Sequence, residues 1–337
     1  MPSTDWKEQI PEGEEALFKG FAEQLRELQR KQVAKYGEIG RALHTKPNAG
    51  LEATFTVLSD LPEHARIGLF ARPASYRAWV RFSNGTGKRQ ADRQPDLRGI
   101  AIKVAGVEGK KLIPGMEDAK TQDFLGLHIP AASFRDVAEF VALIQSAENQ
   151  VLMPFRLAKA LGVGRAFTLL RSLLPSLLTQ VPTLATRHFY SAAPIQYGPY
   201  AVHFALFPCL AQERGGTPKS LGEELSERLK AGPISYEFRV QFFCDEQKTP
   251  LEDPSVEWKE ADAPFLTVGR LTLSQQDTSS ERGQRIAQLV ERFSFDPWHA
   301  LMEHKPLGAL MRARNQAYLL STQERKAAGE PDGTEVI

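Results

Sequence analysis

Six short segments rich in β-branched and aromatic residues recur along the chain, and they constrain its fold more than any other feature. They cover residues 53–58, 78–83, 99–104, 201–207, 236–243 and 265–273. Turn-forming residues separate these segments, so each favours a strand. Short strands spread over such a length are typical of an antiparallel barrel. We therefore predict an α+β fold, an antiparallel β-barrel with surrounding helices.

The remaining chain predicts three additions to the barrel. Residues 12–36 place apolar side chains at helical spacing among many charges, which indicates an amphipathic helix. We predict an N-terminal helical arm over 1–36, a barrel domain over 37–326 with a helical insertion at about 140–188, and a polar tail over 327–337. The tail is expected to fray. With 337 residues and 42% apolar content, the chain can bury a substantial core.

Composition limits the classes of partner and compartment. Forty-two basic and 41 acidic side chains leave no net field that would attract nucleic acid or a membrane. The first residues lack an apolar signal region, so we expect a cytoplasmic protein. Cys209 and Cys244 fit no metal-ligand spacing and are expected to be buried thiols.

A helical pattern near the C-terminus presents a tyrosine between two arginines. Arg314, Tyr318 and Arg325 are separated by four and seven residues, which puts their side chains on one helical face. Nearby cations favour the anionic form of a phenol, and a phenolate is a ligand for iron. An arginine packed over a surface tyrosine ring would give the same pattern.

A second unusual pattern places a cation on a central strand. Trp79, Arg81 and Ser83 share one face of the segment 78–83. A buried arginine needs an anion beside it. A salt bridge to Asp96 or Asp92 would satisfy this need, and so would an anionic ligand.

His44 lies three residues after Arg41, ahead of a turn-rich run that leads into the first strand. This Arg-x-x-His motif, the Arg81-Phe82-Ser83 strand, the segment from Asp96 to Lys103 and the Arg314–Tyr318 helix follow one another in a fixed order. In this order they resemble the haem-pocket motifs of the catalase superfamily, over roughly residues 36 to 326. The match is to the short, catalase-related haem proteins that lack the C-terminal helical domain of the large catalases.

The resemblance implies haem b as cofactor and a role for each matching residue. Tyr318 would be the iron ligand, and His44 the distal acid and base supported by Ser83. Arg41, Arg81 and Arg325 would neutralise the haem propionates and the phenolate. The resemblance also places Arg314 beside the tyrosine and Phe140 against the haem plane.

One position departs from the family pattern. True catalases carry a distal asparagine in a Gly-Asn-Asn-Thr-Pro segment, where this chain has Leu127 after Gly126. A shift of one residue would bring His128 there instead, either as a second distal base or as part of a local turn. The missing amide weakens the expectation of efficient hydrogen peroxide disproportionation.

Residues 151–185 are strongly apolar, with four interleaved basic residues, but Arg171 and Pro175 interrupt them. Three interpretations remain: helices packed over the barrel, which we favour, an interfacial helix facing lipid, or the wall of an apolar substrate channel.

These features predict a haem-dependent oxidoreductase acting on hydrogen peroxide or on an organic or fatty-acid hydroperoxide. One alternative is a fatty-acid hydroperoxide isomerase or lyase, and another is a haem-binding protein with little turnover. Family habit favours a homo-oligomer. Membrane contact is possible but not favoured.

Overall fold

The computed structural model describes residues 2–37, 40–147, 149, 151–178, 181–210, 220–327 and 329–335. Within these ranges the chain forms an antiparallel ring in the order β1-β2-β3-β4-β5-β7-β8-β9, closed by β9 pairing with β1. The ninth strand, β6, pairs with β7 outside the ring. The strands are β1 (Pro47–Val57), β2 (Ala74–Asn84), β3 (Arg98–Ala105), β4 (Thr121–Leu127), β5 (Phe189–Ser191), β6 (Ile195–Tyr197), β7 (Tyr200–Pro208), β8 (Ile234–Phe242) and β9 (Phe265–Leu273). The predicted barrel with surrounding helices is confirmed.

Side-chain alternation gives the barrel two different faces. Val80, Phe82 and Ile102 point into the main hydrophobic core, and their sequence neighbours Arg81 and Lys103 point to the opposite side, as period-two strands require. The predicted shared face of Trp79, Arg81 and Ser83 is therefore the outer face of the barrel. Helices cover this outer face, so its polar side chains lie under protein.

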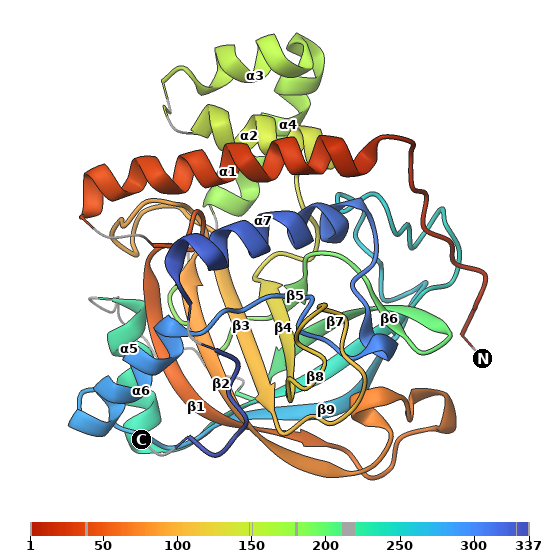
Figure 1. Cartoon of the computed structure of the whole chain (residues 1–337), viewed down its shortest axis with the longest axis vertical. Helices are drawn as coiled ribbons and strands as arrows, with labels where there is room; N and C mark the ends of the chain where they lie inside the picture. Colours follow the sequence, from red (N-terminus) through yellow and green to blue (C-terminus); the bar gives the residue numbers. More distant parts are fainter. Residues whose placement is uncertain are drawn as a thin grey trace.

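Seven helices surround the barrel in the described part of the chain (Figure 1). α1 (Glu14–Tyr36) is the predicted amphipathic arm and packs along α7 (Ala309–Arg325), the tyrosine helix. α6 (Glu281–Arg292) begins at Ser280, whose hydroxyl accepts a hydrogen bond from the Gly283 N–H. The other helices are α2 (Val137–Ala147), α3 (Met153–Leu161), α4 (Val163–Leu178) and α5 (Leu221–Ala231).

The beginning of α7 is fixed from three sides. Gly308 has φ of +84°, and a Cβ there would clash with the carbonyl oxygen of Leu251, so this turn requires glycine. The first free N–H groups of the helix meet carboxylates: Gly308 donates to Glu8 at 2.9 Å and Ala309 to Glu252 at 2.6 Å. Arg312 bonds both of these carboxylates as well. This anchoring sets the position of Tyr318 further along the helix.

Two sequence expectations are wrong. The described part of the tail does not fray, because the Glu330 carboxylate accepts hydrogen bonds from Lys103, Thr121 and Ser294; residues 328, 336 and 337 lie outside the described residues. The two cysteines are free thiols, but Cys209 is exposed and Cys244 half-buried.

Within the described ranges, no helix is both long and apolar enough to cross a membrane.

Candidate functional site

Three neighbouring strands present a row of small and apolar residues to the outer face of the barrel. Ser83 on β2 pairs with Gly99 on β3, and Gly99 pairs with Leu127 on β4. The imidazole of His44 lies on this row. Its Nδ1 is 3.0 Å from Ser83 Oγ, and a Cβ on Gly99 would approach His44 Cε1 to 2.6 Å. Glycine is therefore required at position 99 to leave room for the histidine ring.

His44 itself adopts an unusual backbone conformation. Its φ is +55°, a region that non-glycine residues rarely occupy. Its N–H donates to the Gly85 carbonyl at 3.0 Å, and its own carbonyl accepts from Arg81 at 2.9 Å. Burial, followed by the charges of Arg81, Arg314 and Arg41, lowers the pKa of His44 to about 3. The imidazole is therefore neutral near pH 7 and able to accept a proton.

Three arginines gather around Glu291 beside the histidine, and two of them bond its carboxylate. Arg81 Nε donates to Glu291 at 2.8 Å, and Arg41 bonds the same carboxylate. Arg325 bonds the carbonyl oxygens of Glu291 and Phe293 at 3.5 and 3.2 Å. The expected partners Asp92 and Asp96 are not the partners of Arg81: Asp92 pairs with Lys46, and Asp96 accepts from Thr86.

This arginine cluster carries more positive than negative charge. Three guanidinium groups face one carboxylate, which leaves two positive charges uncompensated. Burial, then repulsion by Arg81 and Arg325, lowers the pKa of Arg41, and burial also lowers that of Arg325. The buried Nε of Arg325 has no hydrogen-bond partner among the described residues. The Glu291 side chain is 42% exposed, whereas the side chains of Arg81 and Arg41 are 3% and 13% exposed. These features fit a ligand with two carboxylates.

Tyr318 lies on α7 close to these groups. Arg314 Nη2 donates to its hydroxyl oxygen at 2.7 Å, and the guanidinium also lies 5.1 Å from the ring centroid. The phenol is close enough to Arg41 to influence its pKa. Arg314 and Arg325 were both predicted to lie beside this tyrosine. Arg314 contacts it, whereas Arg325 bonds the backbone carbonyls of Glu291 and Phe293.

The two remaining candidates lie beside this centre. The N–H of Arg98 donates to His128 Nδ1 at 2.9 Å, and the His128 N–H donates back to the Arg98 carbonyl at 3.0 Å. These bonds make His128 a strand-end histidine, as the turn interpretation expects. Phe140 packs against Phe134 and in a cluster with Ala309 and Ala313 of α7. Its contact with a haem plane stays a prediction.

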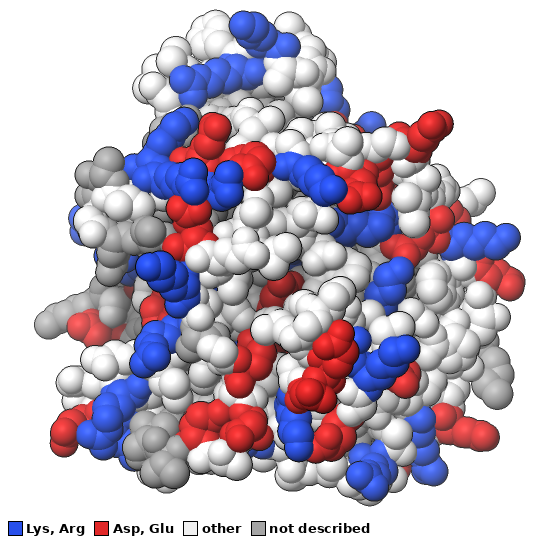
Figure 2. All heavy atoms as spheres, in the orientation of Figure 1, with Lys and Arg blue, Asp and Glu red and all other residues white. Residues whose placement is uncertain are grey.

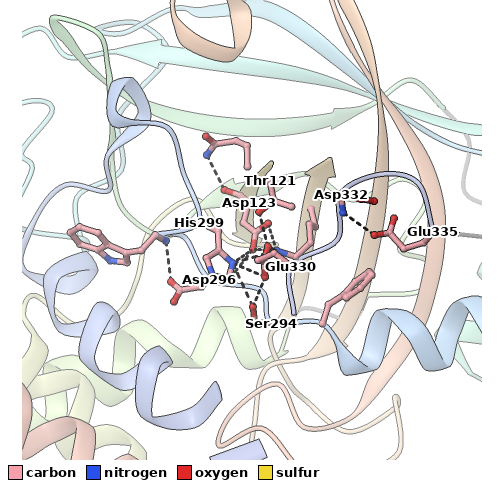
Figure 3. Close-up of polar contacts among 12 residues, drawn as sticks. Thr121, Asp123, Ser294, Asp296, His299, Glu330, Asp332 and Glu335 are labelled. Atoms are coloured by element: carbon pink, nitrogen blue, oxygen red, sulfur yellow. Dashed lines mark hydrogen bonds and ion pairs between the residues drawn. The ribbon is translucent and has the colours of Figure 1, made fainter. Parts of the chain in front are cut away.

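A second buried polar cluster lies further along the same outer face (Figure 3). Ligand atoms of Asp123, His299 and Glu330 lie within 4.8 Å of one another, as in a metal site. Lys103 Nζ, however, bonds Asp123 at 2.8 Å and Glu330 at 2.6 Å. The lysine ammonium therefore supplies the positive charge that a metal ion would bring.

Sequence reasoning did not identify Glu291 or Gly99 as site residues. Glu291 ends the amphipathic pattern of α6, where a single acidic residue carries no distinctive signal. Gly99 lies directly after Arg98 in a segment already matched to the family, and a glycine inside a strand indicates close approach of another group. That rule was a usable signal for the histidine contact.

No family model matches the chain. A catalase-related peroxidase from Mycolicibacterium paratuberculosis is 29% identical over 313 residues, which cover 85% of this chain and 88% of that protein. A bacterial catalase structure aligns with 91% of this chain at a TM-score of 0.65 and 15% identity. A fungal catalase aligns with 90% of it at a TM-score of 0.64 and 16% identity.

Catalase A from Saccharomyces cerevisiae aligns with 98% of this chain at a TM-score of 0.65 and 15% identity. The alignments span 62% of the bacterial and fungal catalases and 68% of the yeast protein. The structural matches agree on the barrel fold, and the sequence match extends over 85% of the chain. The chain therefore has the fold of these catalases and is similar in sequence, over most of its length, to a catalase-related peroxidase.

Proposed function

We propose that this protein is a haem-dependent oxidoreductase acting on peroxides, with Tyr318 as the iron ligand and His44 as the acid and base. The observation that carries the proposal is the convergence of a neutral, buried histidine, a tyrosine bonded to Arg314, and an arginine cluster lacking two negative charges. The two propionates of haem b would supply those charges. The name of the catalase-related relative supports the same activity.

Each residue has a definite task in this proposal. Arg41, Arg81 and Arg325 would hold the propionates, and bidentate guanidinium geometry suits carboxylates. Arg314 donates to the Tyr318 oxygen and would hold that oxygen in place for ligation. Ferric haem would supply a Lewis-acidic iron that accepts electron pairs from peroxide oxygen.

His44 moves the proton. With Nδ1–H donating to Ser83 Oγ, Nε2 would carry the lone pair that accepts a proton from one peroxide oxygen. The same nitrogen would return that proton to the other oxygen. Ser83 is a positioning residue, because it holds the ring in the required tautomer.

The apolar residue at position 127 favours a second candidate, conversion of a fatty-acid hydroperoxide by isomerisation or cleavage. Leu127 lies in the row with Ser83 and Gly99, next to His44, and offers no hydrogen bond to a small peroxide. Incubating the haem-loaded protein separately with hydrogen peroxide and with a polyunsaturated hydroperoxide distinguishes the candidates. Oxygen release supports the first candidate, and a rearranged or cleaved lipid supports the second. If neither product forms, the protein is a haem-binding protein with little turnover.

Tyr318→Phe tests the ligand assignment directly. We expect the haem-loaded protein to show a high-spin ferric spectrum with tyrosinate ligation, and the variant to lose it, because phenylalanine has no oxygen to donate. Tyr76→Phe removes a hydroxyl from a half-buried tyrosine on β2 and serves as the control. An unchanged spectrum in Tyr318→Phe would remove this residue from the axial position.

A further inference from the structure

The helical lobe formed by α2, α3 and α4 projects from the barrel beyond α1 (Figure 1). Its helices α3 and α4 contact chiefly each other and α2. They share a small core of their own around Leu157, Ala166 and Leu169. The favoured interpretation of this apolar segment as helices packed over the barrel is therefore wrong for α3 and α4, which pack within the lobe itself.

The other side of the lobe exposes large apolar residues. Phe155 is 75% exposed, Val163 78% and Phe167 67%, and Val151, Leu152 and Leu174 are exposed as well. These are six of the eleven exposed large apolar side chains in the described ranges. Val163, Phe167 and Leu174 are separated by four and seven residues and so share one face of α4. Such a concentration marks an interaction surface.

Every charged side chain within residues 151–178 is basic. Arg156, Lys159 and Arg171 are exposed, and residues 151–178 contain no Asp or Glu. Arg165 is neutralised by Glu139 of α2. Figure 2 shows the end of the lobe in blue and white without red, while acidic and basic residues are mixed over the body below it.

We propose that this face of the lobe docks on an anionic lipid bilayer. Exposed aromatic and aliphatic side chains would enter the boundary between headgroups and acyl chains, while the flanking lysine and arginines meet lipid phosphates. A second copy of the chain fits less well, because a two-fold contact would bring this basic face against its own copy. The helices would lie along the membrane surface.

Vesicle sedimentation with the full-length, haem-loaded protein tests the proposal. We expect binding to phosphatidylcholine vesicles that contain phosphatidylserine, weaker binding to phosphatidylcholine alone, and loss of the difference in high salt. The double variant Phe155→Glu/Phe167→Glu should lower the partition coefficient by roughly tenfold or more. Lys159→Glu/Arg171→Glu should lower binding to the anionic vesicles by roughly fivefold per charge removed.

Matched controls and a second measurement make the outcomes distinct. Ile10→Glu and Met302→Glu alter exposed apolar side chains away from the lobe and should leave partition unchanged. Equal partition of the parent and Phe155→Glu/Phe167→Glu, with haem content and circular dichroism preserved, would overturn the proposal. So would a dimer, seen by analytical ultracentrifugation, that the same changes abolish. No readout depends on turnover, so failure here is separate from failure of the proposed peroxide chemistry.

Discussion

At the scale of single residues, the histidine of the site is held in place by constraints from several strands. A left-handed backbone at a non-glycine residue costs of order 1–3 kcal/mol, and surrounding contacts must offset that cost. Here the offsets are the backbone bonds of His44 to Gly85 and Arg81, the Ser83 contact and the space above Gly99. A strained and tightly held histidine is consistent with a ring that must be positioned before substrate arrives.

His44→Ala should retain haem but lose most peroxide turnover. The iron would be held from the tyrosine side, whereas acid and base assistance is commonly worth about 10²–10⁴ in rate. Ser83→Ala should cost less, because it removes only the group that orients the ring. Stopped-flow measurement of peroxide consumption at matched haem content checks both. Activity of His44→Ala within a few fold of the parent would exclude it as the proton carrier.

Leu127→Asn should raise oxygen release from hydrogen peroxide and lower turnover of an apolar hydroperoxide. Leu127 pairs with Gly99 and shares its face, so an amide there would lie near the His44 ring. It could position a small peroxide by hydrogen bonding, which leucine cannot do. Oxygen-electrode and product measurements on both substrates test whether the two activities change in opposite directions. If both activities fall together at constant haem content, the residue acts through packing instead.

At the scale of elements, the segment after α7 is fastened to the barrel by an internal ion cluster. Lys103 is fully buried on β3, and Glu330, with 6% of its side chain exposed, reaches it from the tail. The charge of Lys103 and the hydrogen bonds lower the pKa of Glu330 to about 2 against the effect of burial. The tail is therefore part of the cover over the outer face, beside the residues that precede the tyrosine helix.

Glu330→Gln should destabilise the protein by about 3–5 kcal/mol, since removing one partner of a buried ion pair leaves the other uncompensated. Glu281→Gln is the matched control. Glu281 pairs with Arg285 at the surface, and 90% of the Glu281 side chain is exposed. Ion pairs at such exposed sites contribute about 0–1 kcal/mol to the free energy of unfolding. Chemical denaturation followed by circular dichroism measures both. Equal midpoints for the two variants would show that the tail is not fastened through this carboxylate.

Local pattern predicted six of the nine described strands, but not β4. The sequence of β4, Thr121–Leu127, contains several polar residues and a glycine, so it lacks the pattern of a typical strand. One of these polar residues, Asp123, is buried on the outer face of the barrel, where it pairs with Lys103. Spacing along one helix was enough to find Arg314 and Tyr318. Glu291 could not be found that way, because it meets Arg81 across 210 positions and only the folded barrel brings them together.

At the scale of the whole molecule, buried neutral histidines make stability depend on acid. Burial lowers the pKa of His203 and of His304 from 6.5 to about 4. The folded state then binds fewer protons than the unfolded state between these values. Their contribution is complete above about pH 6.5 and is lost as pH falls toward 4. Asp296, whose pKa burial raises to about 6, acts in the opposite direction.

We therefore expect the free energy of unfolding to fall between pH 6.5 and 4, by roughly 3 kcal/mol for each of the two histidines. His203→Gln and His304→Gln should each flatten this dependence, and the half-buried His64 gives His64→Gln as the control. Urea denaturation at a series of pH values measures the slope. A slope unchanged in both core variants would assign acid sensitivity to other groups.

The ring of strands has one narrow joint, and the lobe precedes it in the chain. β5 contains three residues, and it meets β4 through only two residue pairs, one of them Tyr190 with Leu127. A short strand is mechanically compliant, because few backbone hydrogen bonds resist its displacement. A pull on a lobe held at a bilayer would meet the buried Leu184 and Ala185 before it reached β5. Beyond them, the pairs Tyr190–Leu127 and Leu127–Gly99 lead to the floor beneath His44. The core would therefore shield the distal pocket from movements of the lobe.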